Sequence, residues 1–285
     1  MPAELILPPG STLLNELSRA ARDDRCVFFA GLPGVGKTLL VQQLAVLADR
    51  LGRRVHLLQW DVARLAFETP ALLSRYPEVE GVTHAALRKA VGVWVRDAIR
   101  AWDRLHPDAG DLLIGETPLI GNRLIELVRV QDDPAERVLQ SDRTEFLVPA
   151  PSQRVREAIE RARAREMERP SHERETANAP LSLVQAQWSQ VVEAATLLDI
   201  ALPQAPTDYE PAVYAAVYSR LLRHRRHHVL FIDELLVPRG SAYALEVPVQ
   251  SELRPNQDDV ELAMTTVEDW PPDRVAMAVE RWYAV

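Results

Sequence analysis

Eight residues near the N-terminus have the types and the spacing needed to hold a chain of phosphates. The segment Gly31-Leu32-Pro33-Gly34-Val35-Gly36-Lys37-Thr38 matches the pattern G-x-x-x-x-G-K-[ST]. Glycines let the backbone curl tightly, so that its N–H groups point inward toward an anion. In such a loop the lysine reaches the β- and γ-phosphates of a nucleotide, and the last hydroxyl binds Mg²⁺. We therefore expect a phosphate-binding loop, called the P-loop below.

The segments on either side of this loop have the structure that the pattern requires. Cys26–Ala30 is a short apolar run suited to a buried strand, and residues 39–51 carry apolar side chains at helical spacing before Gly52. Strand, glycine loop and helix form the expected context for the pattern. The residues predicted to bind the nucleotide are Gly31, Gly34, Val35, Gly36, Lys37, Thr38 and Leu39.

The choice of basic residues strengthens this prediction. Of the 33 basic residues only Lys37 and Lys89 are lysines, and the other 31 are arginines. A chain so biased toward arginine keeps lysine where a compact ammonium on a flexible stem does what a planar guanidinium cannot. The lysine of the P-loop therefore points to phosphate binding.

Composition limits the other classes of function. The chain has 285 residues and a formal net charge of −8, which argues against a general nucleic-acid binder. Cys26 is the only cysteine, so neither a disulfide framework nor a cysteine metal site is expected. No apolar stretch approaches the roughly 18 residues of a membrane span, and the N-terminus lacks the features of a signal peptide. We expect a cytoplasmic protein with no membrane partner.

Short apolar runs alternate with helical patterns along the chain. This alternation predicts an α/β fold, in which a mostly parallel sheet has helices on both faces. We expect one domain over 1–285, with a helical insertion at 61–110, a lid-like segment at 150–180 and a C-terminal extension at 238–285. The expected strands are 26–30, 54–59, 111–116, 145–148 and 228–232. Further predictions are a helix at 122–130, a strand at 243–247, an acidic loop after it and a last helix from Pro271-Pro272.

Two acids come directly after predicted strands, at the sheet edge where ligands bind in open α/β folds. Asp61 follows the second strand, where it can accept the proton of a substrate hydroxyl, hold a water of Mg²⁺, or cap the next helix. Glu116 ends the third strand, where it can order Mg²⁺ or orient the nucleophile, or be an exposed acid with no such role.

An arginine-rich helix is predicted at 152–169. Arg154, Arg161, Arg165 and Arg169 recur at spacings that place them on one helix face. Such a face suits the charge of a triphosphate, with Arg161 and Arg165 as candidate catalytic residues, but local pairs such as Glu157 with Arg161 would make it a solvated surface instead.

The order of these parts resembles the nucleoside and nucleotide kinase group of P-loop proteins, over residues 26–235. Residues 112–127 (LLIGETPLIGNRLIEL) look like that group's third strand with its Asp-Gly-Phe-Pro-Arg turn and helix. Here the turn is Gly115-Glu116-Thr117-Pro118, and the arginine follows later, at Arg123. Residues 146–152 before the arginine-rich helix resemble the fourth strand and mobile lid, and 228–233 the last core strand.

The resemblance implies ATP-dependent phosphoryl transfer to a small acceptor such as a nucleoside or nucleotide. ATP and Mg²⁺ would be the cofactors, with the metal at Thr38 and Glu116. Lys37, Asp61, Glu116 and the lid arginines Arg161 and Arg165 would form the catalytic set.

The segment 229–234 (VLFIDE) supports a different function. Four apolar residues followed by Asp233 and Glu234 match a Walker B strand, which predicts an ATPase of the AAA or a related class acting as a switch or motor. The segment lies nearly 200 residues after the P-loop, which is late for that role. A regulatory protein that binds nucleotide without turnover is a third alternative.

Overall fold

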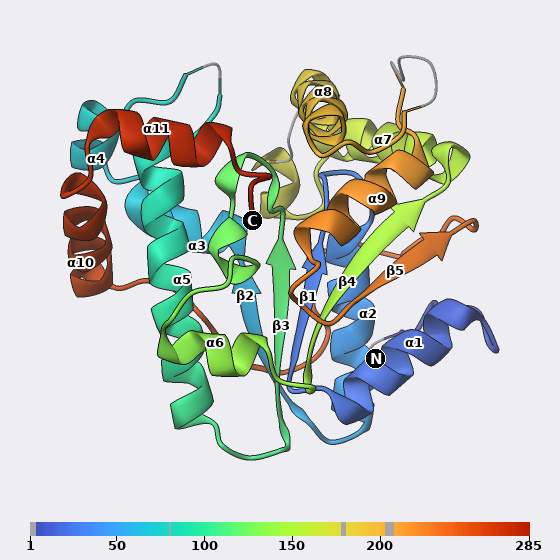
Figure 1. The fold of residues 1–285 in the computed structure, drawn as a ribbon. Coiled ribbons are helices and arrows are strands. Elements are labelled where there is room, and N and C mark those ends of the chain that lie inside the picture. Colours follow the sequence, from blue (N-terminus) through green and yellow to red (C-terminus); the bar gives the residue numbers. More distant parts are fainter. Residues whose placement is uncertain (1–3, 80, 178–180, 203–207) are drawn as a thin grey trace.

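The computed structural model describes residues 4–79, 81–177, 181–202 and 208–285. A six-stranded parallel sheet with the order β5-β4-β1-β3-β2-β6 runs through its centre (Figure 1). The strands are β1 Cys26–Ala30, β2 Arg54–Gln59, β3 Asp111–Thr117, β4 Thr144–Pro151, β5 His227–Ile232 and β6 Val249–Glu252. The predicted α/β class and the parallel sheet are confirmed.

The central strand β1 shows why the sheet is covered on both faces. All five of its residues are buried, and they alternate between two hydrophobic cores. Cys26 and Phe28 belong to one core and Val27 and Phe29 to the other, because successive side chains of a strand point to opposite faces. A strand buried on both sides is therefore a continuous apolar run, as expected for a parallel sheet.

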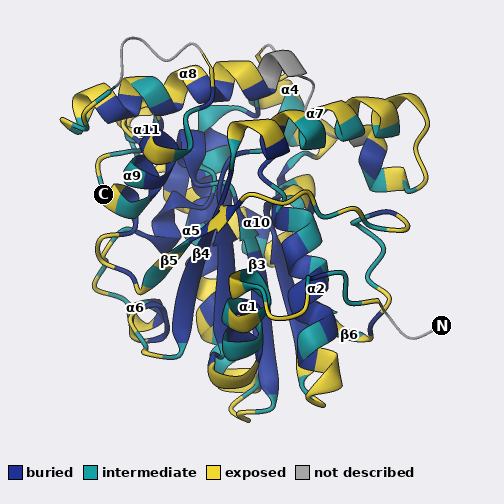
Figure 2. Cartoon of the chain, turned by 90° about the vertical axis from the view of Figure 1, so that its right-hand side faces the viewer, coloured by how far each residue is buried: buried dark blue, intermediate teal, exposed yellow. Residues whose placement is uncertain are grey.

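Helices fill both layers beside the sheet (Figures 1 and 2). α1 (Thr12–Asp23) and α2 (Lys37–Arg50) pack in the core that contains Val27. α5 (Ala85–Leu105), α6 (Pro134–Leu139) and α9 (Pro211–Leu221) pack in the core that contains Phe28. α5 thus lies in the region predicted as a helical insertion, and its apolar stripe is its buried face.

The remaining helices lie around this core. α7 and α8 lie above the carboxyl ends of the strands, and α10 and α11 lie beside α5 (Figure 1). Their bounds are α3 Trp60–Ala63, α4 Pro70–Arg75, α7 Gln153–Glu168, α8 Leu181–Leu197, α10 Gln257–Glu268 and α11 Pro272–Glu280. Short 3₁₀ turns are η1 Arg64–Phe67, η2 Ile120–Asn122, η3 Ile125–Leu127 and η4 Glu173–Ala177. None of the helices in the described ranges is long and apolar enough to cross a membrane.

The helix predicted at 122–130 is wrong. Residues 118–124 form a buried loop in which Leu119, Asn122 and Leu124 have positive φ, as does Gly121. Only glycine adopts such a backbone routinely, so the three other residues are held there by their surroundings. The apolar residues whose spacing resembles that of a helix are instead buried within two 3₁₀ turns, η2 and η3.

Two predictions in the C-terminal extension are also wrong. Residues 243–247 form no strand, and β6 begins later, at Val249, where the chain pairs with β2. The expected acidic loop contains helix α10, whose first turn has a capping box between Asn256 and Asp259. The side chains of Asn256 and Asp259 each accept from the other's backbone N–H, which has no partner within the helix, and acidic residues in the first turn are favoured by the helix dipole.

Candidate functional site

The P-loop connects the end of β1 to the start of α2. Gly34 and Gly36 have φ of 80° and 89°, a conformation that side chains with a Cβ strongly disfavour. Gly31 is required for space, because a Cβ there would lie 2.2 Å from the hydroxyl of Tyr214 on α9. The pattern's glycines therefore allow the curl and the close packing, and the N-terminus of α2 faces the same edge of the sheet.

Lys37 and Thr38 meet Glu116 at the head of this loop. The Lys37 side chain is only 5% exposed; its Nζ donates to the carbonyl of Leu32 at 2.9 Å and lies 3.6 Å from Glu116 Oε1. The Thr38 hydroxyl donates to both carboxylate oxygens, at 3.3 and 3.2 Å. Glu116 reaches this position because β3 pairs directly with β1, with Phe29 opposite Glu116.

Burial sets the electrostatics of this group. Loss of water lowers the pKa of the Lys37 ammonium and raises the pKa of the Glu116 carboxyl, and each charge partly offsets the effect on the other. A hydroxyl and a carboxylate are hard oxygen ligands of the kind that Mg²⁺ prefers. Thr38 and Glu116 can therefore hold such a cation beside the ammonium of Lys37.

A third group at this point comes from the C-terminal extension. The side chain of Tyr243 hydrogen-bonds to that of Thr38, and burial raises the Tyr243 pKa to about 12. Sequence reasoning did not identify Tyr243 as part of the site. Since it lies two hundred residues from the P-loop, no local spacing relates the two.

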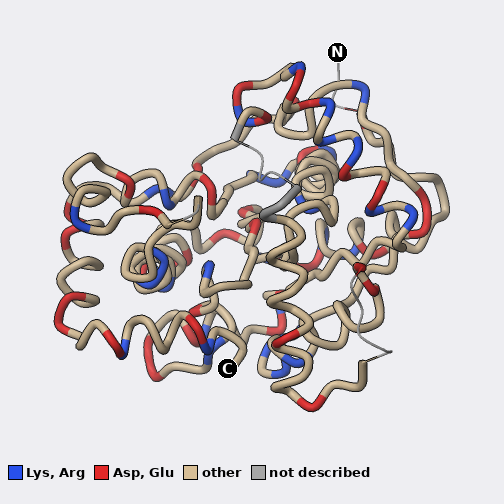
Figure 3. Tube along the Cα trace, turned by 90° about the horizontal axis from the view of Figure 1, so that it is seen from above, with Lys and Arg blue, Asp and Glu red and all other residues tan. Residues whose placement is uncertain are grey.

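A cleft of about 1390 Å³ begins at the P-loop and runs along the carboxyl edge of the sheet. Asp61 and Arg123 line it beyond β2 and β3, and Arg161, Arg163 and Arg165 line it from α7. Seen from above (Figure 3), basic and acidic positions are interspersed over the trace. The residues that line the cleft likewise include both basic and acidic side chains.

Asp61 lies in the first turn of α3 and is 76% exposed. It makes no capping hydrogen bond, so the helix-cap alternative does not describe it. Its carboxylate is 3.4 Å from Arg64 Nε. Burial lowers the pKa of Lys37 and of Arg123, and the charge of Asp61 partly opposes this lowering. Asp61 is thus an accessible carboxylate facing the middle of the cleft.

The helix predicted to carry the lid arginines is α7, and it covers the P-loop. Ile159 Cδ1 and Glu160 Cγ lie 3.8 and 3.6 Å from where a Cβ on Gly36 and on Gly34 would be. Glu160 is paired with Arg156 at 2.8 Å. The carboxyl edge of β1 is therefore roofed by this helix.

The four arginines predicted to form one helix face have different surroundings, and three of them lie in α7. Arg161 and Arg165 line the cleft; Arg161 is 66% exposed and 3.7 Å from Glu157, and Arg165 Nε donates to the Arg161 carbonyl at 3.3 Å. Arg154 donates instead to the carbonyl of Asp233 at 2.8 Å, and Arg169 follows the helix as an exposed residue.

Arg163 is the arginine of α7 that acts electrostatically on the P-loop residues. Burial lowers the Lys37 pKa and raises the Glu116 pKa; the charge of Arg163 adds to the first effect and partly opposes the second. The helix face defined in the sequence by Arg154, Arg161, Arg165 and Arg169 does not include Arg163, so the sequence pattern does not single it out. Its position three residues after Glu160 places it on the face that contacts the loop.

Asp233 and Glu234 follow β5, which is an edge strand separated from β1 by β4. Both are exposed, and Glu234 lines the cleft. Within the described part of the chain, the acid that contacts Thr38 is Glu116 and not Asp233. The Walker B pattern therefore lies away from the cation ligands that the P-loop offers.

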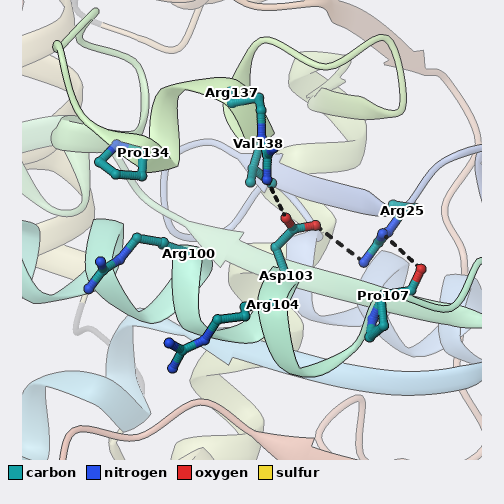
Figure 4. A pocket seen from close by; sticks show the side chains of 8 residues that line it. All are labelled: Arg25, Arg100, Asp103, Arg104, Pro107, Pro134, Arg137 and Val138. Carbon is teal, nitrogen blue, oxygen red and sulfur yellow. Dashed lines mark hydrogen bonds and ion pairs between the residues drawn. The ribbon is translucent and has the colours of Figure 1, made fainter.

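A second cavity, of about 610 Å³, is lined by residues from the start of β1, the end of α5 and α6 (Figure 4). Asp103 lies between Arg25 and Arg137, with N–O distances of 3.4 and 3.5 Å. None of the residues predicted to act on a nucleotide lines it.

No protein-family model matches this chain, and neither the curated proteins nor the solved structures contain a match to it.

Proposed function

We propose that this protein is a P-loop phosphotransferase that moves the γ-phosphoryl group of ATP to a small acceptor, such as a nucleoside or nucleotide. The observation that carries the proposal is the contact of Lys37 and Thr38 with Glu116 at the head of a cleft. A lysine and a hydroxyl from the loop, with one acid from the neighbouring strand, are the groups that nucleotide phosphates and their cation require.

Each group has a role that follows from its charge and position. The P-loop amides and Lys37 bind the phosphates, and Thr38 and Glu116 would hold Mg²⁺, which neutralises charge on the transferring group. Asp61 is exposed in the same cleft, where a carboxylate can accept the proton of an acceptor hydroxyl. The arginines 161, 163 and 165 of α7 supply further positive charge from the opposite side.

The length of the cleft favours transfer over simple hydrolysis. It continues from the P-loop past Asp61 to Arg123, which leaves room for a second molecule beside the nucleotide. α7 lies against the P-loop glycines, and closure of such a helix over a bound nucleotide would favour reaction with a bound acceptor over reaction with water.

The test is to measure ADP formation with Mg²⁺-ATP in the absence and presence of a panel of nucleosides, nucleotides and other small acceptors. We expect ADP formation that depends on the acceptor and is lost in Lys37→Ala. Equal hydrolysis without any acceptor would favour the ATPase alternative. Tight nucleotide binding with no turnover under any condition would favour a regulatory protein.

A further inference from the structure

The second cavity, at the other end of β1 from the P-loop, is lined by arginines from three segments of the chain. Arg25 immediately precedes β1, Arg100 and Arg104 lie in successive turns of α5, and Arg137 lies in α6 (Figure 4). Asp103 is the acid of this lining, which therefore carries a net charge of +3 from four arginines and one aspartate. The chain as a whole has a net charge of −8, so the cavity concentrates charge of the opposite sign.

Asp103 is shared between two of these arginines and holds neither closely. Its oxygens lie 3.4 Å from Arg25 Nη2 and 3.5 Å from Arg137 Nη2 (Figure 4). Charge-assisted hydrogen bonds between such groups are ordinarily about 2.7–2.9 Å long. A single carboxylate shared at longer distances leaves both guanidinium groups able to bind a further anion.

The two arginines of α5 are neutralised still less. Arg100 is 3.1 Å from Asp97, which lies outside the lining, and no ion pair or hydrogen bond joins the Arg104 side chain to another residue of the described ranges. The helix dipole favours a cation in the last turn of a helix, which accounts for Arg104 on α5. It does not account for the arrival of Arg25 and Arg137 at the same cavity from other segments.

Arg25 is held in place by its surroundings. Its side chain is 17% exposed, its terminal nitrogens donate to the carbonyls of His106 and Pro107, and its guanidinium lies 5.3 Å from the centre of the Trp102 ring. Its Nε atom is buried without a hydrogen-bond partner in the part of the chain described. A guanidinium that packing already fixes loses little conformational entropy when it binds an anion.

We propose that this cavity is a second anion site, which binds a small molecule carrying a diphosphate or triphosphate group. Its volume of about 610 Å³ lies within the range of about 300–1,000 Å³ that is usual for small-ligand sites. Several guanidinium groups around one site are suited to a group with several negatively charged oxygens. Two prolines and a valine complete the lining and offer apolar contact to the rest of such a molecule. The proposal does not rest on the phosphotransferase function, because none of these residues lines the cleft at the P-loop.

The test is calorimetric titration of tripolyphosphate, without Mg²⁺, into the full chain carrying Lys37→Ala, which weakens binding of the same probe at the P-loop. We expect saturable binding that is weakened about three- to tenfold when Arg104→Gln or Arg137→Gln is added, because each removes one exposed charge from the ligand. Both residues are exposed, so the variants should fold. Arg22→Gln is the matched control, since Arg22 is also an exposed arginine in the last turn of a helix but does not line the cavity.

Absence of saturable binding, or equal binding in Arg104→Gln, Arg137→Gln and Arg22→Gln, would overturn the inference. If Lys37→Ala does not fold, the same comparison of variants is made in the parent chain. Asp103→Asn should tighten binding, because it removes the carboxylate that competes with the ligand for Arg25 and Arg137. Unchanged or weaker binding there would mean that these groups form a structural cluster.

The test also separates a small ligand from a nucleic acid. We expect a single-stranded oligonucleotide to bind more weakly than tripolyphosphate, because the net charge of −8 repels an extended polyanion outside the cavity. An oligonucleotide that binds more tightly than tripolyphosphate, and is weakened by Arg104→Gln, would overturn the assignment of a small ligand.

Discussion

The two lysines of the chain are both buried beside a glutamate, but they are held differently. Lys89 Nζ is 2.7 Å from Glu126, in a pair that supports the loop after β3. Lys37 Nζ is 3.6 Å from Glu116 and is satisfied mainly by the carbonyl of Leu32. The first is a close buried ion pair, whereas the second has a longer ion-pair distance and a carbonyl contact that a phosphate oxygen can replace.

This difference predicts opposite outcomes for two substitutions. Lys37→Ala should weaken Mg²⁺-ATP binding about 10- to 100-fold, the usual effect of losing a hydrogen bond from a charged donor. Lys89→Met should lower the free energy of unfolding by about 3–5 kcal/mol, because Glu126 stays buried with only the more distant Arg129, at 4.0 Å, as a counter-charge. Calorimetric titration and chemical denaturation measure the two effects. Unchanged nucleotide affinity in a folded Lys37→Ala protein would contradict the assignment of the P-loop.

Asp111 makes a prediction about pH. Its two oxygens accept from Arg54 Nε and Nη2 at 2.8 Å, and these bonds lower its pKa from the ordinary 3.8 to about 2. A carboxyl whose pKa is depressed on folding adds stability above its unfolded pKa, and that stability is lost as the pH falls from 3.8 through 2. Asp111→Asn should therefore be less stable than the parent at neutral pH.

The difference in unfolding free energy between parent and Asp111→Asn should shrink as the pH falls from 4 toward 2. Urea denaturation at a series of pH values measures it. Asp97→Asn removes an exposed carboxylate 3.1 Å from Arg100 and should show little change over the same range. A constant difference for Asp111→Asn across this range would mean that the Arg54 pair adds no pH-dependent stability.

At the scale of elements, α7 combines close contact with the P-loop and little burial of its own. Only Val155 and Arg156 of this sixteen-residue helix are buried. Its contact side presents Ile159 and Glu160 to the loop glycines, and Arg163 acts on Lys37 and Glu116. A helix with so small a buried face can move away from the P-loop at a low cost in free energy. A bound anion between α7 and the P-loop would attract the arginines of α7 and stabilise the contact.

We expect amide hydrogen exchange across residues 150–177 to slow when Mg²⁺ and an ATP analogue bind, because an anion joins the arginines of α7 to the loop. Arg163→Gln should reduce this protection, whereas Arg169→Gln, beyond the helix end and exposed, should leave it intact. Mass spectrometry of peptides from this segment gives the measurement. Equal exchange with and without nucleotide would mean that α7 is a solvated surface helix that does not respond to the nucleotide.

The sequence predicted those elements whose pattern agrees with their environment. β1 and β2 have the expected bounds: β1 is a continuous apolar run buried on both faces, and β2 carries apolar residues at 55, 57 and 58. β6 was missed because its four residues, VQSE, are mostly polar and gain their strand form from pairing with β2. The loop at 118–124 overlaps a predicted helix because the positive φ of Leu119 and Leu124 cannot be recognised from the spacing of apolar residues.

The same limit applies to the site. The P-loop and Glu116 could be predicted because a local pattern and a strand end fix their positions. The positions of Tyr243 and Arg163 beside Lys37, Thr38 and Glu116 depend on how distant segments pack, which no spacing within one segment encodes. The part of the site that could not be predicted is therefore the part that depends on tertiary packing between distant segments.

For the whole molecule, strand order decides which acid can serve the P-loop. β3 lies directly beside β1 and ends in Glu116, while β5 lies at the edge beyond β4 and precedes Asp233 and Glu234. In parallel sheets the ligand site forms where neighbouring strands end together. The sheet therefore brings Glu116 to Thr38 and leaves the β5 acids at the far side of the cleft.

This arrangement predicts a ranking of three charge-neutralising substitutions. Asp61→Asn and Glu116→Gln should lower acceptor-dependent turnover by about 10²- to 10⁴-fold, the usual effect of losing a positioned acid or base. Asp61→Asn should keep ATP affinity, since Asp61 faces the acceptor side of the cleft. Glu234→Gln should lower turnover less than about tenfold, because nothing in the described structure connects Glu234 with Thr38 or Lys37.

Steady-state ADP formation and calorimetric ATP binding on the three variants separate the two enzymatic alternatives. In an ATPase that uses the β5 acids the ranking reverses: Glu234→Gln would bind ATP tightly without hydrolysing it, and Asp61→Asn would be nearly as active as the parent. That reversed pattern would contradict the phosphotransferase assignment even if Lys37→Ala behaved as expected, because both alternatives share the P-loop. The discriminating residues are therefore the acids, whose distance from Thr38 is set by the order of strands across the sheet.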